Sequence, residues 1–145
     1  RSSCDEVIVE YVVCDTSVVS SLRRNDGRCA SMTLLEAAVK MVSVVTVAEL
    51  RSGAIQAGWG DKKRHELEAR INAYVRIAVD DEVADVWSSL NAECVRQGRN
   101  VGSNDLWIAA TAVRLGCPVA ALDDDFARIP GIQLLGPDGL LVETD

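Results

Sequence analysis

Short apolar runs alternate with longer segments of helical periodicity along this chain. Runs rich in β-branched and apolar residues predict strands at 7–14, 41–45, 75–79, 119–122 and 132–135. Apolar residues at helical spacing, with turn residues between the segments, predict helices at 17–24, 32–40, 46–57, 62–74, 81–96 and 103–115. Buried strands separated by helices imply parallel crossovers, with helices on both faces of the sheet. The pattern therefore predicts an α/β protein, a three-layer α/β/α sandwich around a short, mostly parallel sheet.

The composition is that of an ordinary globular protein. The 145 residues show no internal repeat, linker or shift in composition, so we expect one domain spanning residues 1–145. No apolar run approaches the length of a membrane span, and Glu10 interrupts the first apolar stretch, so we expect no membrane association and a cytoplasmic protein. The five cysteines are odd in number and far apart, which predicts reduced thiols and no structural zinc.

Acidic residues stand at the strand-to-helix junctions. Asp15 and Asp123 follow the first and fourth expected strands, Glu49 lies early in the helix after the second strand, and Asp105 lies in the first turn of the 103–115 helix. Because the carboxyl ends of parallel strands meet at one edge of a sheet, these four carboxylates are expected to share one rim. Such a cluster is costly unless cations neutralise it, and hard oxygen ligands select Mg²⁺ or Mn²⁺.

Each acid also has a purely structural interpretation. Asp15 fits the N-cap of the following helix, and Thr46 with Glu49 matches a capping box. Asp105 suits a helix dipole, and residues 123–125 suit a turn that opens a short 3₁₀ segment. Caps need only Ser or Thr, however, so acids at all four junctions favour the metal-site interpretation.

Four segments in this order resemble the PIN-domain family, and in particular the VapC-type toxins of bacterial toxin–antitoxin pairs. They are VIVEYVVCDTSVV, VVTVAELRSGA, GSNDLWIAATAVRLGCPV and AALDDDFARIPGIQLL, and the likeness covers nearly the whole chain. The resemblance implies a PIN-like fold. It also implies an acidic metal site of Asp15, Glu49, Asp105 and Asp123, with Asp124 as a competing register for the fourth acid. Four neighbouring polar residues match supporting positions of the family: Thr16, Ser17, Asn104 and Asp125.

The resemblance further implies an endoribonuclease toxin that depends on Mg²⁺, or Mn²⁺, and is inhibited by a cognate antitoxin. The metal would polarise the phosphodiester and activate water, giving 5′-phosphate and 3′-hydroxyl products, with Asp15 or Asp105 as a candidate proton acceptor. A homodimer is also implied. The number of metals, the RNA cleaved and the identity of the antitoxin stay open.

A net charge of −7 disfavours RNA binding through the overall field of the protein. Phosphate contacts must therefore be local, and candidates are Lys62, Lys63, Arg64, Arg70 and Arg76, with Arg51 or Arg114 near the crevice. Because aromatic residues are few and Trp107 fits a core position, a structured RNA such as tRNA or rRNA, read through backbone and shape, is expected. Two alternatives remain: an aspartate-based phosphatase or receiver-like domain, and a catalytically inactive PIN-like binding module.

Overall fold

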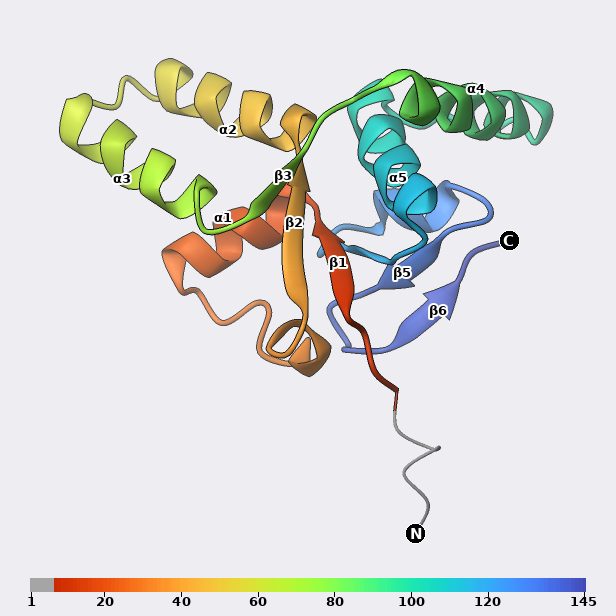
Figure 1. The fold of residues 1–145 in the computed structure, drawn as a ribbon, viewed down its shortest axis with the longest axis horizontal. Coiled ribbons are helices and arrows are strands. Elements are labelled where there is room, and N and C mark those ends of the chain that lie inside the picture. The colour runs from red at the N-terminus through yellow and green to blue at the C-terminus, as the bar shows by residue number, and fades with distance from the viewer. Residues whose placement is uncertain (1–6) are drawn as a thin grey trace, which may run out of the picture.

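A six-stranded sheet forms the centre of the computed structural model, which describes residues 7–145 (Figure 1). The strands are β1 (Tyr11–Cys14), β2 (Val39–Ser43), β3 (Val75–Ile77), β4 (Val119–Ala120), β5 (Gln133–Leu135) and β6 (Leu141–Glu143). The helices are α1 (Thr16–Arg24), α2 (Val44–Gln56), α3 (Asp61–Ile71), α4 (Asp81–Arg96) and α5 (Ser103–Leu115), with 3₁₀ helices η2 (Thr33–Leu35) and η3 (Asp124–Arg128). The spatial strand order is β3-β2-β1-β4-β5-β6.

The sheet is parallel except at one edge. β1 pairs in parallel with β2 on one side and β4 on the other, β3 extends the sheet beyond β2, and β5 extends it beyond β4. Only β6 is antiparallel, and it pairs with β5. The predicted mostly parallel sheet is therefore confirmed, and its carboxyl ends gather the starts of α1 and α2.

Alternate strand residues point into two separate hydrophobic cores, one on each face. Val12 and Cys14 of β1 belong to one core, whereas Val13 belongs to the other. The first core also holds buried residues of α1, α2 and α3, and the second holds those of α4 and α5. Figure 1 shows α1, α2 and α3 on one side of the sheet and α4 and α5 on the other. This arrangement confirms the predicted three-layer sandwich.

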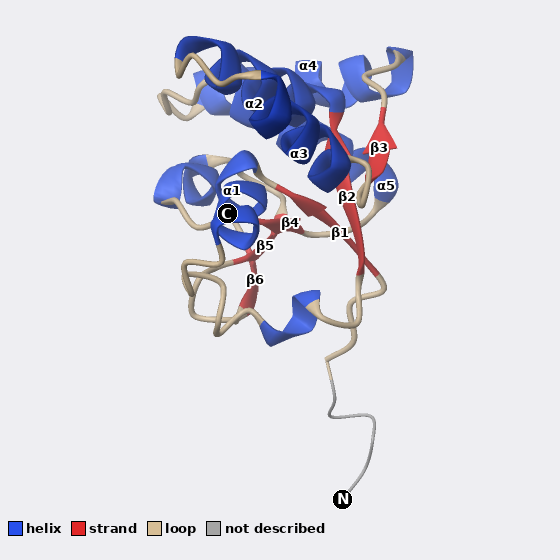
Figure 2. Cartoon of the chain, turned by 90° about the vertical axis from the view of Figure 1, so that its left-hand side faces the viewer, coloured by secondary structure: helices blue, strands red, loops and turns tan. Residues whose placement is uncertain are grey.

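Three predicted boundaries in the first third of the chain are wrong. The helix expected at 32–40 is only the short 3₁₀ helix η2, because residues from Val39 onward pair with β1, where Val39 lies opposite Tyr11. The second strand consequently starts two residues earlier than the expected 41–45 and ends at Ser43. Figure 2 shows β2 leading into α2, with α3 beside it. The first strand, expected at 7–14, begins only at Tyr11, and the other predicted elements lie close to their expected positions.

The last strand, β6, was absent from the prediction. Residues 136–139 form the turn between β5 and β6, in which the side chain of Asp138 accepts a hydrogen bond from the Leu140 amide. Gly139 has a φ of 82°, and a Cβ at this position would lie 2.1 Å from the Ser31 carbonyl oxygen. The turn therefore requires glycine and packs against the loop before η2.

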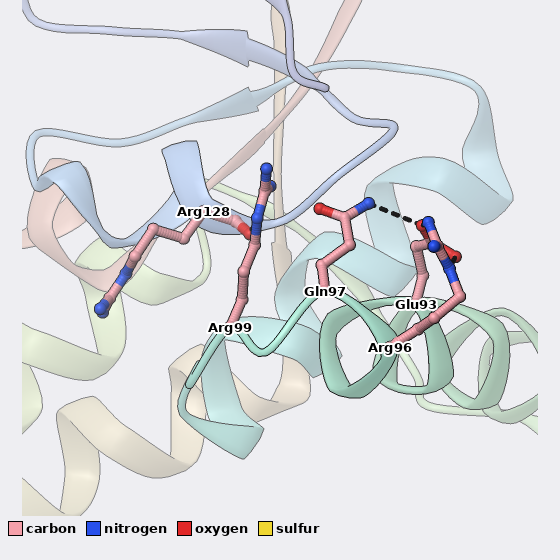
Figure 3. A network of polar contacts seen from close by, with 5 residues as sticks. All are labelled: Glu93, Arg96, Gln97, Arg99 and Arg128. Carbon is pink, nitrogen blue, oxygen red and sulfur yellow. Dashed lines mark hydrogen bonds and ion pairs between the residues drawn. The ribbon is translucent and has the colours of Figure 1, made fainter.

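The side chain of Arg99 connects the loop after α4 to η3. Arg99 donates a hydrogen bond of 3.1 Å to the carbonyl oxygen of Arg128, at the end of η3 (Figure 3). On the same side, Glu93 accepts hydrogen bonds from Arg96 and Gln97, which hold the pKa of this exposed carboxyl down at about 2. Of these contacts, the Arg99 hydrogen bond reaches the segment that carries residues 124–128. Within residues 7–145, no helix is both long and apolar enough to span a membrane.

Candidate functional site

Asp15 lies directly after β1 and is 5% exposed. Its Oδ2 atom accepts hydrogen bonds from the Ser17 hydroxyl, at 2.7 Å, and from the Ser17 amide, at 3.3 Å. The Ser17 hydroxyl in turn accepts a hydrogen bond from the Leu122 amide, which follows β4. Asp15 therefore caps α1, as its structural interpretation predicts, and Ser17 fixes the carboxylate between the ends of two neighbouring strands. Burial raises the pKa of Asp15, and the Glu49 charge adds to this effect.

Glu49 connects three helices through its carboxylate. Oε1 accepts a 2.6 Å hydrogen bond from the Thr16 hydroxyl of α1, and Oε2 accepts a 3.3 Å hydrogen bond from the Asn104 amide of α5. The capping-box interpretation is wrong, because α2 begins at Val44 and its cap is Ser43, whose hydroxyl accepts from the Val45 amide. Glu49 lies more than a turn inside the helix and points toward the start of α1. Two predicted supporting residues, Thr16 and Asn104, therefore contact a predicted ligand.

Asp105 is half-buried in the first turn of α5. Burial and, in addition, four neighbouring carboxylates raise its pKa from an ordinary 3.8 to about 6. These are Asp15, Asp125, Glu49 and Asp123. No hydrogen bond from another described residue reaches the Asp105 carboxylate, so both oxygens are available to a cation or water. The structure thus brings the acids of three predicted junctions into one electrostatic cluster around Asp105.

The aspartates after β4 are exposed and differ in their surroundings. Asp123 is the N-cap residue of η3, but its side chain makes no capping hydrogen bond. Asp125 forms an ion pair with Arg128 at 3.3 Å. Both carboxylates are among the charges that raise the pKa of Asp105. Asp123 and Asp124 are both exposed, so Asp123 as the fourth acid, with Asp124 as the competing register, stays a prediction from the family resemblance.

The donor set fits a hard divalent cation that keeps part of its water shell. No group of three or more His, Cys, Asp or Glu side chains within residues 7–145 is arranged closely enough to hold one ion directly. Charge–charge effects, such as those on Asp105, act over longer distances than metal–ligand bonds. Mg²⁺ is usually held by one or two carboxylates and several waters, which suits spaced, uncompensated carboxylates. A cation at this rim would also relieve the repulsion that raises the pKa of Asp105.

Three of the predicted basic residues contact other side chains of the protein. Lys63 lies over the ring of Trp59 with Nζ 4.2 Å from the ring centroid, and the Arg23 guanidinium packs against the same ring. Arg51 is paired instead with Glu68 of α3, at 2.7 Å. Arg114 forms an ion pair with Glu82 of α4. Arg51 and Arg114 are therefore engaged within the protein, and Lys63 is part of a cluster that the sequence did not reveal.

The cysteine thiols play no part in this site. Cys14, Cys29, Cys94 and Cys117 are free, as expected, and Cys4 lies outside the described residues. Burial raises the pKa of Cys14 to about 12 and that of Cys117 to about 11. Neither thiol is a nucleophile at neutral pH.

Comparison with known proteins agrees with this geometry. A family model described as the PIN domain matches residues 12–132. Ribonuclease VapC5 of Mycobacterium tuberculosis is 37% identical over 121 residues, which cover 82% of this chain and 87% of that protein. VapC ribonuclease Y4jK of Sinorhizobium fredii is 30% identical over 138 residues, covering 87% of this chain and 96% of that one.

Solved structures give the same result. The crystal structure of VapBC-5 from M. tuberculosis, a member of the VapBC family of toxin–antitoxin systems, superposes with a TM-score of 0.63 at 34% identity, covering 81% of this chain and 88% of that one. VapBC2 from Rickettsia felis matches with a TM-score of 0.76 at 19% identity, covering 87% and 98%, and supports the fold alone. The domain match, the two relatives and the acids gathered at the ends of the parallel strands all lead to one assignment: this chain belongs to the PIN-domain family, among its VapC-type members.

Proposed function

We propose that this protein is a divalent-metal-dependent endoribonuclease and the toxin of a toxin–antitoxin pair. The observation that carries the proposal is the gathering of Asp15, Glu49, Asp123 and Asp125 around the half-buried Asp105, where burial first, and these four charges in addition, raise the pKa of Asp105 to about 6. Such repulsion in a metal-free protein is typical of a site built for a cation. The VapC ribonucleases that share a third of its residues support RNA as the substrate.

Asp15, Glu49, Asp105 and Asp123 would hold Mg²⁺ or Mn²⁺, which supplies Lewis-acid polarisation of the scissile phosphate when bound. Ser17 restricts the Asp15 carboxylate through two hydrogen bonds to Oδ2. Thr16 and Asn104 hold Glu49 in place from opposite sides. Because no hydrogen bond occupies the Asp105 carboxylate, we favour Asp105 over Asp15 as the acceptor of the proton from the attacking water. Attack by water on phosphorus, with the bond to the 3′-oxygen breaking and that oxygen taking up a proton, would give 5′-phosphate and 3′-hydroxyl ends.

The partner proposal rests on the solved relative from M. tuberculosis that is 34% identical to this chain, a member of the VapBC family of toxin–antitoxin systems. A VapB-type antitoxin is therefore the proposed inhibitor of this chain. Homodimerisation, predicted from the family resemblance, is checked by sedimentation equilibrium of the isolated protein.

The test is RNA cleavage with Mg²⁺, with Mg²⁺ replaced by chelator, and with Asp15→Asn. We expect cleavage only by the wild type with metal, and products whose ends are 5′-phosphate and 3′-hydroxyl. Asp124→Asn is the matched control, because it removes a neighbouring exposed carboxylate outside the proposed ligand set. Release of inorganic phosphate without RNA cleavage would support the phosphatase alternative. Metal-independent binding without cleavage would support the inactive-module alternative.

A further inference from the structure

A cavity of about 620 Å³ lies between α2 and α5, beside the acidic rim. Glu49 and Asn104, which belong to the rim, form part of its wall. The remaining wall includes Ser52, Gly53 and Gln56 of α2 and Trp107 of α5. The cavity is therefore continuous with the candidate metal site, and none of its side chains outside the rim has a role in the proposed chemistry.

Trp107 is a rigid, half-buried part of this wall. Its ring stacks on that of Trp87 from α4, with centroids 5.0 Å apart and an angle of 22° between the planes. The backbone carbonyl of Trp107 accepts a 2.9 Å hydrogen bond from the Thr111 hydroxyl, one turn later in the helix. The stack restricts the indole before a ligand arrives, so an aromatic group in the cavity would meet a pre-ordered aromatic surface.

Gly53 keeps the opposite wall open. It lies inside the α2 helix, where glycine is unfavourable relative to alanine, and its backbone is not in the left-handed region. A Cβ at Gly53 would meet no atom within 4 Å, so neither helix packing nor a tight turn requires glycine there. Because Gly53 has no side chain, this part of the wall is formed by backbone alone.

Amide groups line the same cavity. Gln56 donates from Nε2 to the Ser52 hydroxyl at 2.9 Å, and Asn104 donates from Nδ2 to Glu49. No hydrogen bond between described residues uses the side-chain oxygen of either amide. An aromatic surface combined with amide groups is the chemistry that proteins use for an unpaired nucleobase, which stacks on one side and forms hydrogen bonds at its edge.

We propose that this cavity receives one unpaired nucleobase of the RNA, adjacent to the phosphodiester that is cleaved at the acidic rim, and that Trp107 is its stacking surface. The inference rests on the proposed function and adds to it: the cleaved bond lies in a single-stranded loop, and one flanking base is read by the protein. The sequence interpretation of Trp107 as a core residue is then only half of its role.

The test is an abasic scan of a cleaved RNA oligonucleotide, in which each nucleotide near the cut is replaced in turn by an abasic one. With Mg²⁺, we expect kcat/KM of the wild type to fall at one flanking position by about fivefold to 150-fold, the range for loss of one base–aromatic stack. Trp107→Ala should lose a similar factor on intact RNA and be insensitive to the abasic change at that position. Trp107→Phe should restore part of the sensitivity.

Gly53→Leu is a second variant, because it fills the cavity and leaves the Trp107 packing intact. In Gly53→Leu, kcat/KM should no longer fall when the flanking nucleotide is abasic. The variant should melt at or above the melting temperature of the wild type. Trp59→Leu, on the other side of the protein, is the matched control and should keep the wild-type abasic profile. Binding of the same oligonucleotides to Asp15→Asn without metal, measured by fluorescence anisotropy, should show the same single sensitive position.

The outcomes separate the two proposals. The wild type, Trp107→Ala and Gly53→Leu could all cleave RNA and lose the same factor of kcat/KM on each abasic oligonucleotide. This result would overturn the nucleobase site and leave the ribonuclease assignment standing. Absence of cleavage by the wild type would overturn the proposed function, and the anisotropy scan would then decide the base site on its own. Equal affinity for every abasic oligonucleotide in that scan would reject the nucleobase site.

Discussion

Replacing Asp105 with Asn should stabilise the metal-free protein at neutral pH, although it removes a proposed ligand. In the wild type the carboxylate is half-buried and surrounded by other acids, which holds its pKa at about 6 instead of 3.8. The asparagine side chain has nearly the same shape and carries no charge. The substitution therefore removes repulsion and partial desolvation while changing the packing little.

The magnitude follows from the pKa difference of about 2 units, which corresponds to ~3 kcal/mol at most, at about 1.4 kcal/mol per unit. Because Asp105 is half-exposed, solvent screening reduces this to roughly 1–2 kcal/mol. The folded-state pKa lies above the unfolded one, so the folded wild type binds more protons between these values and loses stability as pH rises from about 4 to about 6. Asp105→Asn should match the wild type near pH 4 and exceed it by roughly 1–2 kcal/mol at pH 7.

Urea denaturation at pH 4 and pH 7, with chelator, measures this difference. Asp124→Asn is the control and should show a smaller gain, because Asp124 is exposed and the charges of Asp15, Asp125, Glu49 and Asp123 contribute most to the raised pKa of Asp105. Adding Mg²⁺ should stabilise the wild type at pH 7 and narrow the gap to Asp105→Asn. The electrostatic explanation would be refuted if Asp105→Asn were less stable than the wild type at pH 7. It would also be refuted if the gain in unfolding free energy were the same at pH 4 and pH 7.

Three further predictions concern groups that shape the site and the fold. Ser17→Ala removes the hydroxyl that bonds both Asp15 and the Leu122 amide, so the unfolding free energy should fall by about 1–3 kcal/mol in urea titrations, with reduced cleavage. Gly139→Ala forces a Cβ against the Ser31 carbonyl oxygen, and calorimetry should show a melting temperature several degrees lower, whereas an unchanged melting temperature would contradict the turn geometry. Cys14, with its pKa raised to about 12, should resist alkylation at pH 8 in the native protein and react after unfolding, as mass spectrometry can show.

The sequence predicted helices best where apolar spacing and the residues that end the helix agree. The helices at 81–96 and 103–115 were predicted with the bounds that the structure shows, because their apolar spacing and closing glycines agree. Asp15 and Glu49 were identified as candidates from their places after strands, and the structure brings both to Asp105.

The failures have local causes. The segment 32–40 has helical spacing, but Val39 and the residues after it pair with β1, and this pairing decides the conformation. The sequence of the segment itself does not show that it pairs with β1. The Thr46–Glu49 capping box was a coincidence of spacing, since the strand ends at Ser43 and the helix starts there. β6 was missed although Pro137-Asp138-Gly139 is a turn signal between two apolar runs. The cavity beside Trp107 depends on how α2 and α5 pack, which periodicity does not describe.

The central claim is that acids from separate segments bind one divalent cation together. Calorimetric titration of Mn²⁺ into the metal-free protein at pH 7 tests this most directly, with Asp15→Asn, Asp105→Asn and Asp124→Asn titrated alongside. The account predicts saturable binding by the wild type and by Asp124→Asn, and at least tenfold weaker binding by the other two variants. Equal Mn²⁺ affinity in all four proteins, or no binding by the wild type, would contradict it.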